Sequence, residues 1–205
     1  MTLTVQTDSD GHEFNVWAQR QANSCAVASI WMARGMARQM TFDEGEWDLA
    51  WRTYNNAVAG GTWRTPYADP GPAPAPQTFD HTQYDAGHHA FANTFASTGI
   101  GGDHIASMLM QEGFAVNRVV NTGGLMPVKF ANLAPTKPAI VGVGWFVQNP
   151  AGAWERRGGH AIVAARKTSS GQIVLLDPAG GRLVECANNG RYGGNGLIVE
   201  VLYIS

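Results

Sequence analysis

The hydrophobic positions before Pro138 predict helices. Residues 25–39 run through Ala, Val, Ile, Trp and Met, and Asn23 or Ser24 before them is a residue type that caps a helix start. A second helix is predicted over 43–55, because its first turn is acidic, which suits the positive end of the helix dipole. Apolar residues recur there at helical spacing: Trp47, Ala50, Trp51 and Tyr54.

The pattern after Pro138 predicts strands instead. Residues 139–147 form a nearly continuous apolar run, as expected of a strand buried on both faces. Residues 160–167 and 173–177 are two further strands, and the polar segment Thr-Ser-Ser-Gly-Gln between them predicts a hairpin. Residues 196–205 give a terminal strand. Helices followed by an antiparallel meander favour an α+β fold, with an N-terminal helical half packed on a C-terminal antiparallel β-sheet.

A proline- and glycine-rich insertion separates the two halves. From Gly60 to Gln77 the prolines remove backbone donors and fix φ, so this part is expected to be an irregular surface loop with polyproline II character. Short helices are expected over 88–97 and 103–111, the latter ending at Gly113. We therefore expect a single catalytic domain over 1–205 with an insertion at about 56–100.

Composition and charge narrow the class of protein. The chain has 205 residues, 44% of them hydrophobic and 15% charged, enough for one substantial core. A net charge of -2 and scattered basic residues leave no footprint for nucleic acid. No apolar run approaches the roughly 20 residues of a membrane span. The polar, acidic segment 1–15 is no Sec signal peptide, so we expect a protein that is cytoplasmic in the producer or exported by a specialised secretion system.

Two cysteines do not make a disulfide framework in a chain of this size. Counting alone leaves a Cys25–Cys186 bridge open, but two free thiols are the simpler expectation. Cys25 stands at the predicted helix start, where the dipole and unpaired N–H groups lower a thiol pKa. The alternative for Cys25 is a small buried hydrophobic residue.

Gln19 precedes Cys25 by six residues and adds a second chemical role. A side-chain amide on the loop before the nucleophile's helix is placed to stabilise the oxyanion of a tetrahedral intermediate. The alternatives are an ordinary polar loop residue at this position and Gln21 in the same role.

His160 and Asp177 lie at the two ends of the predicted hairpin. Folding it over residues 169–171 brings them within a residue or two of being opposite, and cross-strand neighbours approach to about 5 Å. Asp177 is then placed to orient the imidazole, which leaves the other ring nitrogen for a thiol. Asp177-Pro178 also reads as a turn that ends the strand, and both interpretations hold together.

Other candidate sites in the sequence are weaker. The polar residues of the insertion include a set with metal-ligating side chains: Asp80, His81, Asp85, His88 and His89. Their irregular spacing favours a solvated loop, so no metal and no organic cofactor is expected. Gly142-Val-Gly144 lacks the third glycine and the helix start of a dinucleotide site. Trp145 and Trp154 border the hairpin, and either is a candidate wall of a cleft.

These residues resemble the papain-like cysteine peptidase superfamily, in particular bacteriocin leader peptidase domains and papain-like bacterial effector proteases. The likeness rests on Gln19 six residues before Cys25, on Gly159-His160 before an apolar strand, and on Asp177-Pro178 after the next one. It implies a papain-like fold with catalytic Cys25, His160, Asp177 and Gln19. The chain departs from the leader peptidases in having Ser before and Ala after the cysteine, where they usually have Asp and Gly.

The implied activity is thiol acyl transfer on a peptide or protein amide by a cysteine protease, in the manner of a bacterial effector or toxin, which implies an immunity or inhibitor protein as a partner. Two alternatives stay open. One is deamidation or transglutamination of a glutamine side chain on the same scaffold. The other is a non-catalytic binding module, against which the complete set of four chemical roles argues.

Overall fold

The computed structural model describes residues 2–20, 23–42, 46, 49–50, 100–121, 130 and 133–205. The chain opens with a β-hairpin, in which β1 (Thr2–Thr7) pairs antiparallel with β2 (Glu13–Ala18). Its turn contains Gly11 with a φ of 85°, a conformation that glycine adopts without strain. The sequence-based interpretation missed this hairpin because its outer face is exposed and its alternation is mostly polar; Leu3 and Val5 are 40% and 60% exposed.

Two helices follow the hairpin with defined ends. Helix α1 spans Cys25–Arg38 and ends at Gln39, which takes the left-handed conformation with a φ of 53°. Helix α4 spans Gly102–Gln111, and its end is followed by Gly113 with a φ of 85°. Both predicted helices are confirmed.

The insertion lies outside the described residues, apart from its last position, and so does the short helix predicted over 88–97. Of the helix predicted over 43–55, the described residues are helical: Glu46, Leu49 and Ala50.

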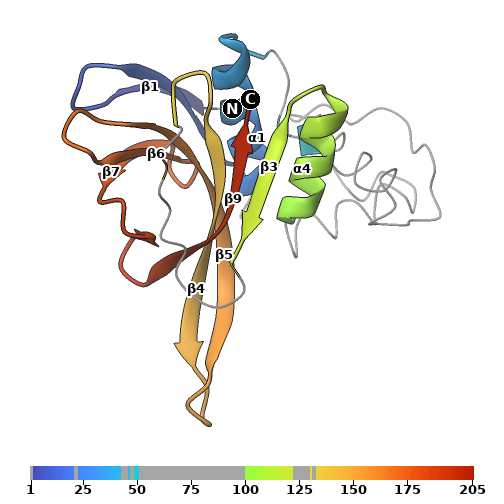
Figure 1. The fold of residues 1–205 in the computed structure, drawn as a ribbon, viewed down its shortest axis with the longest axis vertical. Coiled ribbons are helices and arrows are strands. Elements are labelled where there is room, and N and C mark those ends of the chain that lie inside the picture. Colours follow the sequence, from blue (N-terminus) through green and yellow to red (C-terminus); the bar gives the residue numbers. More distant parts are fainter. Residues whose placement is uncertain are drawn as a thin grey trace.

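The remaining strands form one antiparallel sheet in the order β3-β9-β4-β5-β6-β7, with β8 added to β9 (Figure 1). The strands are β3 (Val116–Val120), β4 (Ala139–Gln148), β5 (Trp154–Lys167), β6 (Ile173–Asp177), β7 (Arg182–Cys186), β8 (Arg191–Tyr192) and β9 (Gly196–Ile204). The strands and the hairpin predicted after Pro138 are confirmed, and β5 begins six residues before its predicted start at His160.

The expectation of a helical N-terminal half packed on a C-terminal sheet is wrong. The part of the chain that the structure describes is mostly antiparallel β-sheet, and it begins with strands rather than helices. Helices were expected throughout the first half of the chain, whereas β1 and β2 precede α1. Strand β1 is only six residues long, and its two alternating apolar residues, Leu3 and Val5, are exposed rather than part of the core.

Both faces of the central strands are covered. Along β5, Ala161, Val163 and Ala165 belong to the core cluster that contains α1, whereas Ile162 and Ala164 belong to a second cluster on the opposite face. This arrangement explains the nearly continuous apolar run of these strands. It also places α1 and α4 over one face of the sheet, where the candidate site is formed.

The β4–β5 hairpin extends beyond the rest of the sheet (Figure 1). Strand β6 pairs with β5 only between Val163 and Lys167, so among the described strands the earlier part of β5 has a partner on one side alone, β4. His160 lies just outside the β5–β6 ladder, next to this free edge. None of the helices in the described ranges is long and apolar enough to cross a bilayer.

Candidate active site

Cys25 is the first residue of α1 and is half-buried. Burial raises the pKa of its thiol, but hydrogen bonds from His160 and from the backbone N–H groups of Ala161 and Ala26, together with the imidazolium charge, outweigh burial. The net effect lowers the pKa of Cys25 below its ordinary value. A helix start facing a histidine is the setting in which thiols ionise near neutral pH.

His160 connects the thiol to Asp177. Its Nε2 lies 2.6 Å from Oδ1 of Asp177, and the ring is also hydrogen-bonded to Cys25, which leaves Nδ1 as the atom that faces the thiol. Burial lowers the pKa of His160, but these two partners more than offset it and raise the pKa to about 9. The imidazole is therefore held as a cation between two acidic groups at neutral pH.

Asp177 is 1% exposed and is satisfied on both carboxylate oxygens. Besides His160, Oδ1 accepts from the backbone N–H of Ala179 at 2.8 Å. Oδ2 accepts from the Tyr192 hydroxyl and from Nε and Nη2 of Arg182 at 3.1 and 2.9 Å. Burial raises the pKa of Asp177, but the hydrogen bonds from His160, Tyr192 and Ala179 more than offset burial and lower the pKa to about 2. This buried carboxyl therefore stays ionised.

The sequence-based interpretation found the hairpin pair but missed Tyr192 and Arg182. Arg182 lies directly opposite Asp177 in the β6–β7 ladder, so extending the same cross-strand argument by one strand identifies it. Tyr192 reaches Asp177 from β8, a two-residue strand whose position depends on β9. No local pattern marks such a residue.

The main chain of Gln19 is tied to the same corner of the molecule. Its N–H donates to the carbonyl of Pro178 at 2.9 Å, which joins the loop before α1 to the residue after Asp177. Its predicted oxyanion role stays a prediction, because Gln19 is not among the described residues that line the cleft beside the thiol. Asn23 lines that cleft and is a second side-chain amide on the same loop.

The cleft beside Cys25 has a volume of about 590 Å³. The starts of α1 and α4 form its walls, and β4, β5 and β9 form its floor. Much of the floor is backbone without side chains, at Gly142, Gly158 and Gly159. The thiol and the imidazole therefore face a space in which an extended chain can lie close to the sheet.

Trp145 lies near His160. Its ring centroid is 6.1 Å from that of His160, with the ring planes inclined by 39°. Trp154, at the far end of the β4–β5 hairpin, is 67% exposed. Trp145 thus covers one side of the imidazole, whereas Trp154 stands in solvent.

No protein-family model matches the sequence, and a search of curated proteins finds no significant match.

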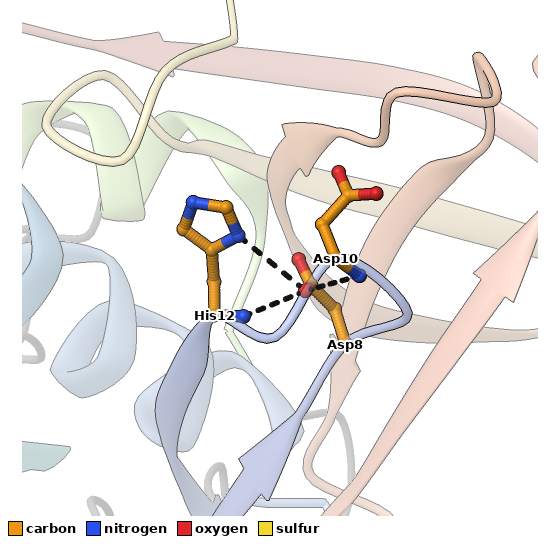
Figure 2. A group of neighbouring side chains, drawn as sticks. All are labelled: Asp8, Asp10 and His12. Atoms are coloured by element: carbon orange, nitrogen blue, oxygen red, sulfur yellow. Dashed lines mark hydrogen bonds and ion pairs between the residues drawn. The ribbon is translucent and has the colours of Figure 1, made fainter.

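A second group of titratable side chains lies far from this cleft. Figure 2 shows one Asp8 oxygen accepting from the backbone N–H groups of Asp10 and His12, at 3.0 and 2.9 Å, with the His12 ring 3.5 Å away. Arg166 lies 2.5 Å from Asp8 and 2.8 Å from Asp10 and supplies the cation that these carboxylates need. The group fastens the β1–β2 turn to β5. The metal candidates of the insertion, residues 80–89, lie outside the described residues.

Cys186 differs from Cys25 in its surroundings. Both thiols are free, as expected from the cysteine count. Burial alone raises the pKa of Cys186, and no histidine contributes to its environment. One chain thus contains an activated thiol and an ordinary one.

Proposed function

We propose that this protein is a cysteine peptidase that hydrolyses an amide bond of a peptide or protein by thiol acyl transfer. The observation that carries the proposal is the continuous hydrogen-bonded row Cys25–His160–Asp177, which begins at a helix start and opens into the cleft. The order of the three residues resembles that of papain-like peptidases, and the proposal extends to a bacterial effector or toxin.

The reaction needs no group from outside the chain. The Cys25 thiolate attacks the carbonyl carbon, and the carbonyl electron pair moves onto oxygen. The free N–H groups at the start of α1, with an amide from Gln19 or Asn23, stabilise that oxyanion. His160 then gives its proton to the leaving nitrogen as the C–N bond breaks. Water attacks the thioester with His160 as base, which releases the acid and restores the thiolate–imidazolium pair.

The buried Asp177 carboxylate makes this cycle possible at neutral pH. It compensates the imidazolium charge and fixes the ring so that Nδ1 faces the thiol. Tyr192 and Arg182 in turn hold the carboxylate. Held in this way, His160 stays protonated until it donates its proton to the leaving nitrogen.

The first test is alkylation of the two cysteines by iodoacetamide at about pH 6, read by mass spectrometry. An ordinary thiol, with a pKa of about 8.5, is almost entirely protonated there and reacts slowly, whereas an ion-paired thiolate reacts fast. We expect fast labelling of Cys25, slow labelling of Cys186, and loss of the fast reaction in His160→Ala. Equal, slow labelling of both cysteines would refute an activated thiol.

The second test is hydrolysis of an unfolded protein such as casein, with Cys25→Ala as the control. New peptide N-termini that appear with the wild type alone support a peptidase. Release of ammonia without chain cleavage would instead indicate that the protein deamidates glutamine side chains.

A further inference from the structure

Arg156 is a cation on the wall of the catalytic cleft. It lies on β5, four residues before His160, and lines the same space as Cys25 and His160. The sequence-based interpretation gave it no role. Its neighbour Arg157 does not line the cleft and forms an ion pair with Glu155 at 3.0 Å.

The backbone holds Arg156 in place. Its Nε donates to the carbonyl of Gly158 at 2.9 Å, and its Nη2 lies 3.4 Å from the carbonyl of Val143. The guanidinium occupies space that side chains would fill. A Cβ at Gly159 would lie 2.5 Å from Nη2, and one at Gly144 would lie 3.1 Å from Nε. The β-bulge after Gly144 and these glycines together form a seat for the guanidinium.

No carboxylate neutralises Arg156 within the described ranges, where its partners are the two carbonyls. The acidic residue of the cleft, Glu200, is already bound to Nε of Arg118, which also reaches Asp103 at 2.8 Å. The thiolate and imidazolium of the catalytic pair compensate each other. Among the described residues that line the cleft, Arg156 is thus a charged side chain without an ion-pair partner, and several of its N–H groups remain available.

We propose that Arg156 determines specificity by binding a carboxylate of the substrate, either an Asp or Glu side chain near the scissile bond or a chain terminus. The proposal deepens the peptidase function and rests on it. A guanidinium binds a carboxylate through two parallel N–H···O bonds, a geometry that neutral side chains do not match. Because Arg156 is already fixed by Gly158, little side-chain entropy is lost on binding.

The experiment compares two probes that differ by one charge, N-iodoacetyl glutamic acid amide and N-iodoacetyl glutamine amide. Both alkylate Cys25, and mass spectrometry gives the ratio of the acidic to the neutral rate at that residue. A second pair with a glycine spacer moves the carboxylate further from the thiol. Small neutral thiols in solution give the reference ratio. Measurement at about pH 9 as well as pH 6 keeps the ratio accessible even with an ordinary thiol.

We expect the rate ratio at Cys25 to exceed the solution reference and to fall about three- to tenfold in Arg156→Gln, in the range of charge-assisted contacts. Added salt lowers the wild-type ratio. Arg157→Gln, which removes the same charge one residue away, leaves the ratio unchanged. Arg156→Lys keeps the positive charge but lacks the two parallel N–H donors of a guanidinium, so its rate ratio should lie between those of the wild type and Arg156→Gln.

A wild-type ratio equal to the solution reference for both probe pairs overturns the proposal, and so does an equal fall in Arg157→Gln. The wild-type comparison suffices even where Arg156→Gln fails to fold. Slow reaction of Cys25 with the neutral probe at about pH 6 would instead count against the peptidase itself. The two failures are therefore told apart within one data set.

Discussion

Tyr192 donates its hydroxyl hydrogen to Oδ2 of Asp177, the carboxylate oxygen that does not bind His160. Burial and the adjacent carboxylate raise the pKa of Tyr192, so the hydroxyl keeps its proton and remains the donor. The hydroxyl is one of four groups that hold the carboxylate, with His160, Arg182 and the N–H of Ala179. The orientation of His160 thus depends on a tyrosine three strands further along the chain.

Tyr192→Phe removes this hydrogen bond with little change of volume. We expect it to lower the free energy of unfolding by about 1–3 kcal/mol, as for hydrogen bonds to charged groups. The alkylation rate of Cys25 at about pH 6 should fall as well, because a less firmly held Asp177 stabilises the imidazolium less. Denaturant unfolding and iodoacetamide kinetics measure the two effects.

Tyr203→Phe is the matched control. Tyr203 is half-buried in the same core cluster, and within the described residues its hydroxyl has no hydrogen-bond partner. Its replacement should leave the alkylation rate unchanged. Identical rates for Tyr192→Phe and wild type would show that Asp177 is held without the tyrosine.

The sequence predicted that His160 and Asp177 lie together because their geometry is local. The turn over 168–172 fixes the register of β5 and β6, and this register brings His160 to Asp177 without help from the rest of the chain. The position of Cys25 at the start of a helix was predicted for a similar reason, since the apolar run that forms α1 begins directly after it. Whether the thiol meets the imidazole depends on how α1 packs on β5, which the pattern does not encode.

The remaining features depend on contacts between distant segments. Tyr192 meets Asp177 only because β8 pairs with β9. The seat of Arg156 combines glycines from two strands, Gly144 and Gly159, which appear in the sequence as ordinary strand glycines. The ion pairs from Asp8 and Asp10 to Arg166, which fasten the β1–β2 turn to β5, also join segments far apart in the sequence.

Substitutions in the catalytic row should differ in severity. Cys25→Ala removes the nucleophile and should abolish peptide hydrolysis while leaving folding intact. His160→Ala should slow hydrolysis by roughly 10²–10⁴-fold, the usual contribution of a general acid–base residue. Asp177→Asn should be milder, because the imidazole remains. Cys186→Ser is the control and should retain full activity. Hydrolysis rates and circular dichroism of each variant check these expectations; turnover by Cys25→Ala would disprove the mechanism.

Arg166→Met should destabilise the fold without touching the cleft. Asp8 is buried, and loss of its guanidinium partner leaves a carboxylate oxygen unsatisfied, at a cost of about 1–3 kcal/mol. Arg157→Met removes an exposed arginine from the same strand and should change stability by no more than about 0.5 kcal/mol. Denaturant unfolding measures the free energy of unfolding of the two variants. Equal values for both would show that the contacts of Arg166 with Asp8 and Asp10 do not stabilise the fold.

EDTA should leave the melting temperature unchanged. The group Asp8, Asp10 and His12 brings three ligand atoms within 4.8 Å of one another, but the guanidinium of Arg166 already pairs with both carboxylates. A melting temperature that falls on chelation and recovers on addition of calcium would show that a cation binds there after all.

The pH dependence of hydrolysis follows from the shifted pKa values of Cys25 and His160. Activity requires an ionised Cys25 and a protonated His160. It should therefore rise through the lowered pKa of Cys25 and fall again near pH 9, the raised value of His160. In Asp177→Asn the alkaline fall should move to lower pH, because the carboxylate that raises the histidine pKa is gone. An alkaline limb unchanged in that variant would separate Asp177 from the histidine.

Stability should respond to pH differently from activity. Up to about pH 9, and above the ordinary His pKa of 6.5, folding keeps a proton on His160 that the unfolded chain has lost. The lowered pKa of the folded Cys25 acts in the opposite sense, because above that pKa the folded thiol has lost a proton that the unfolded thiol still carries. The two contributions to the slope therefore oppose each other. Asp177 acts at acid pH: its contribution is present above about 3.8 and is lost as pH falls through about 2. Urea unfolding across this range should show the acid loss in wild type and less of it in Asp177→Asn.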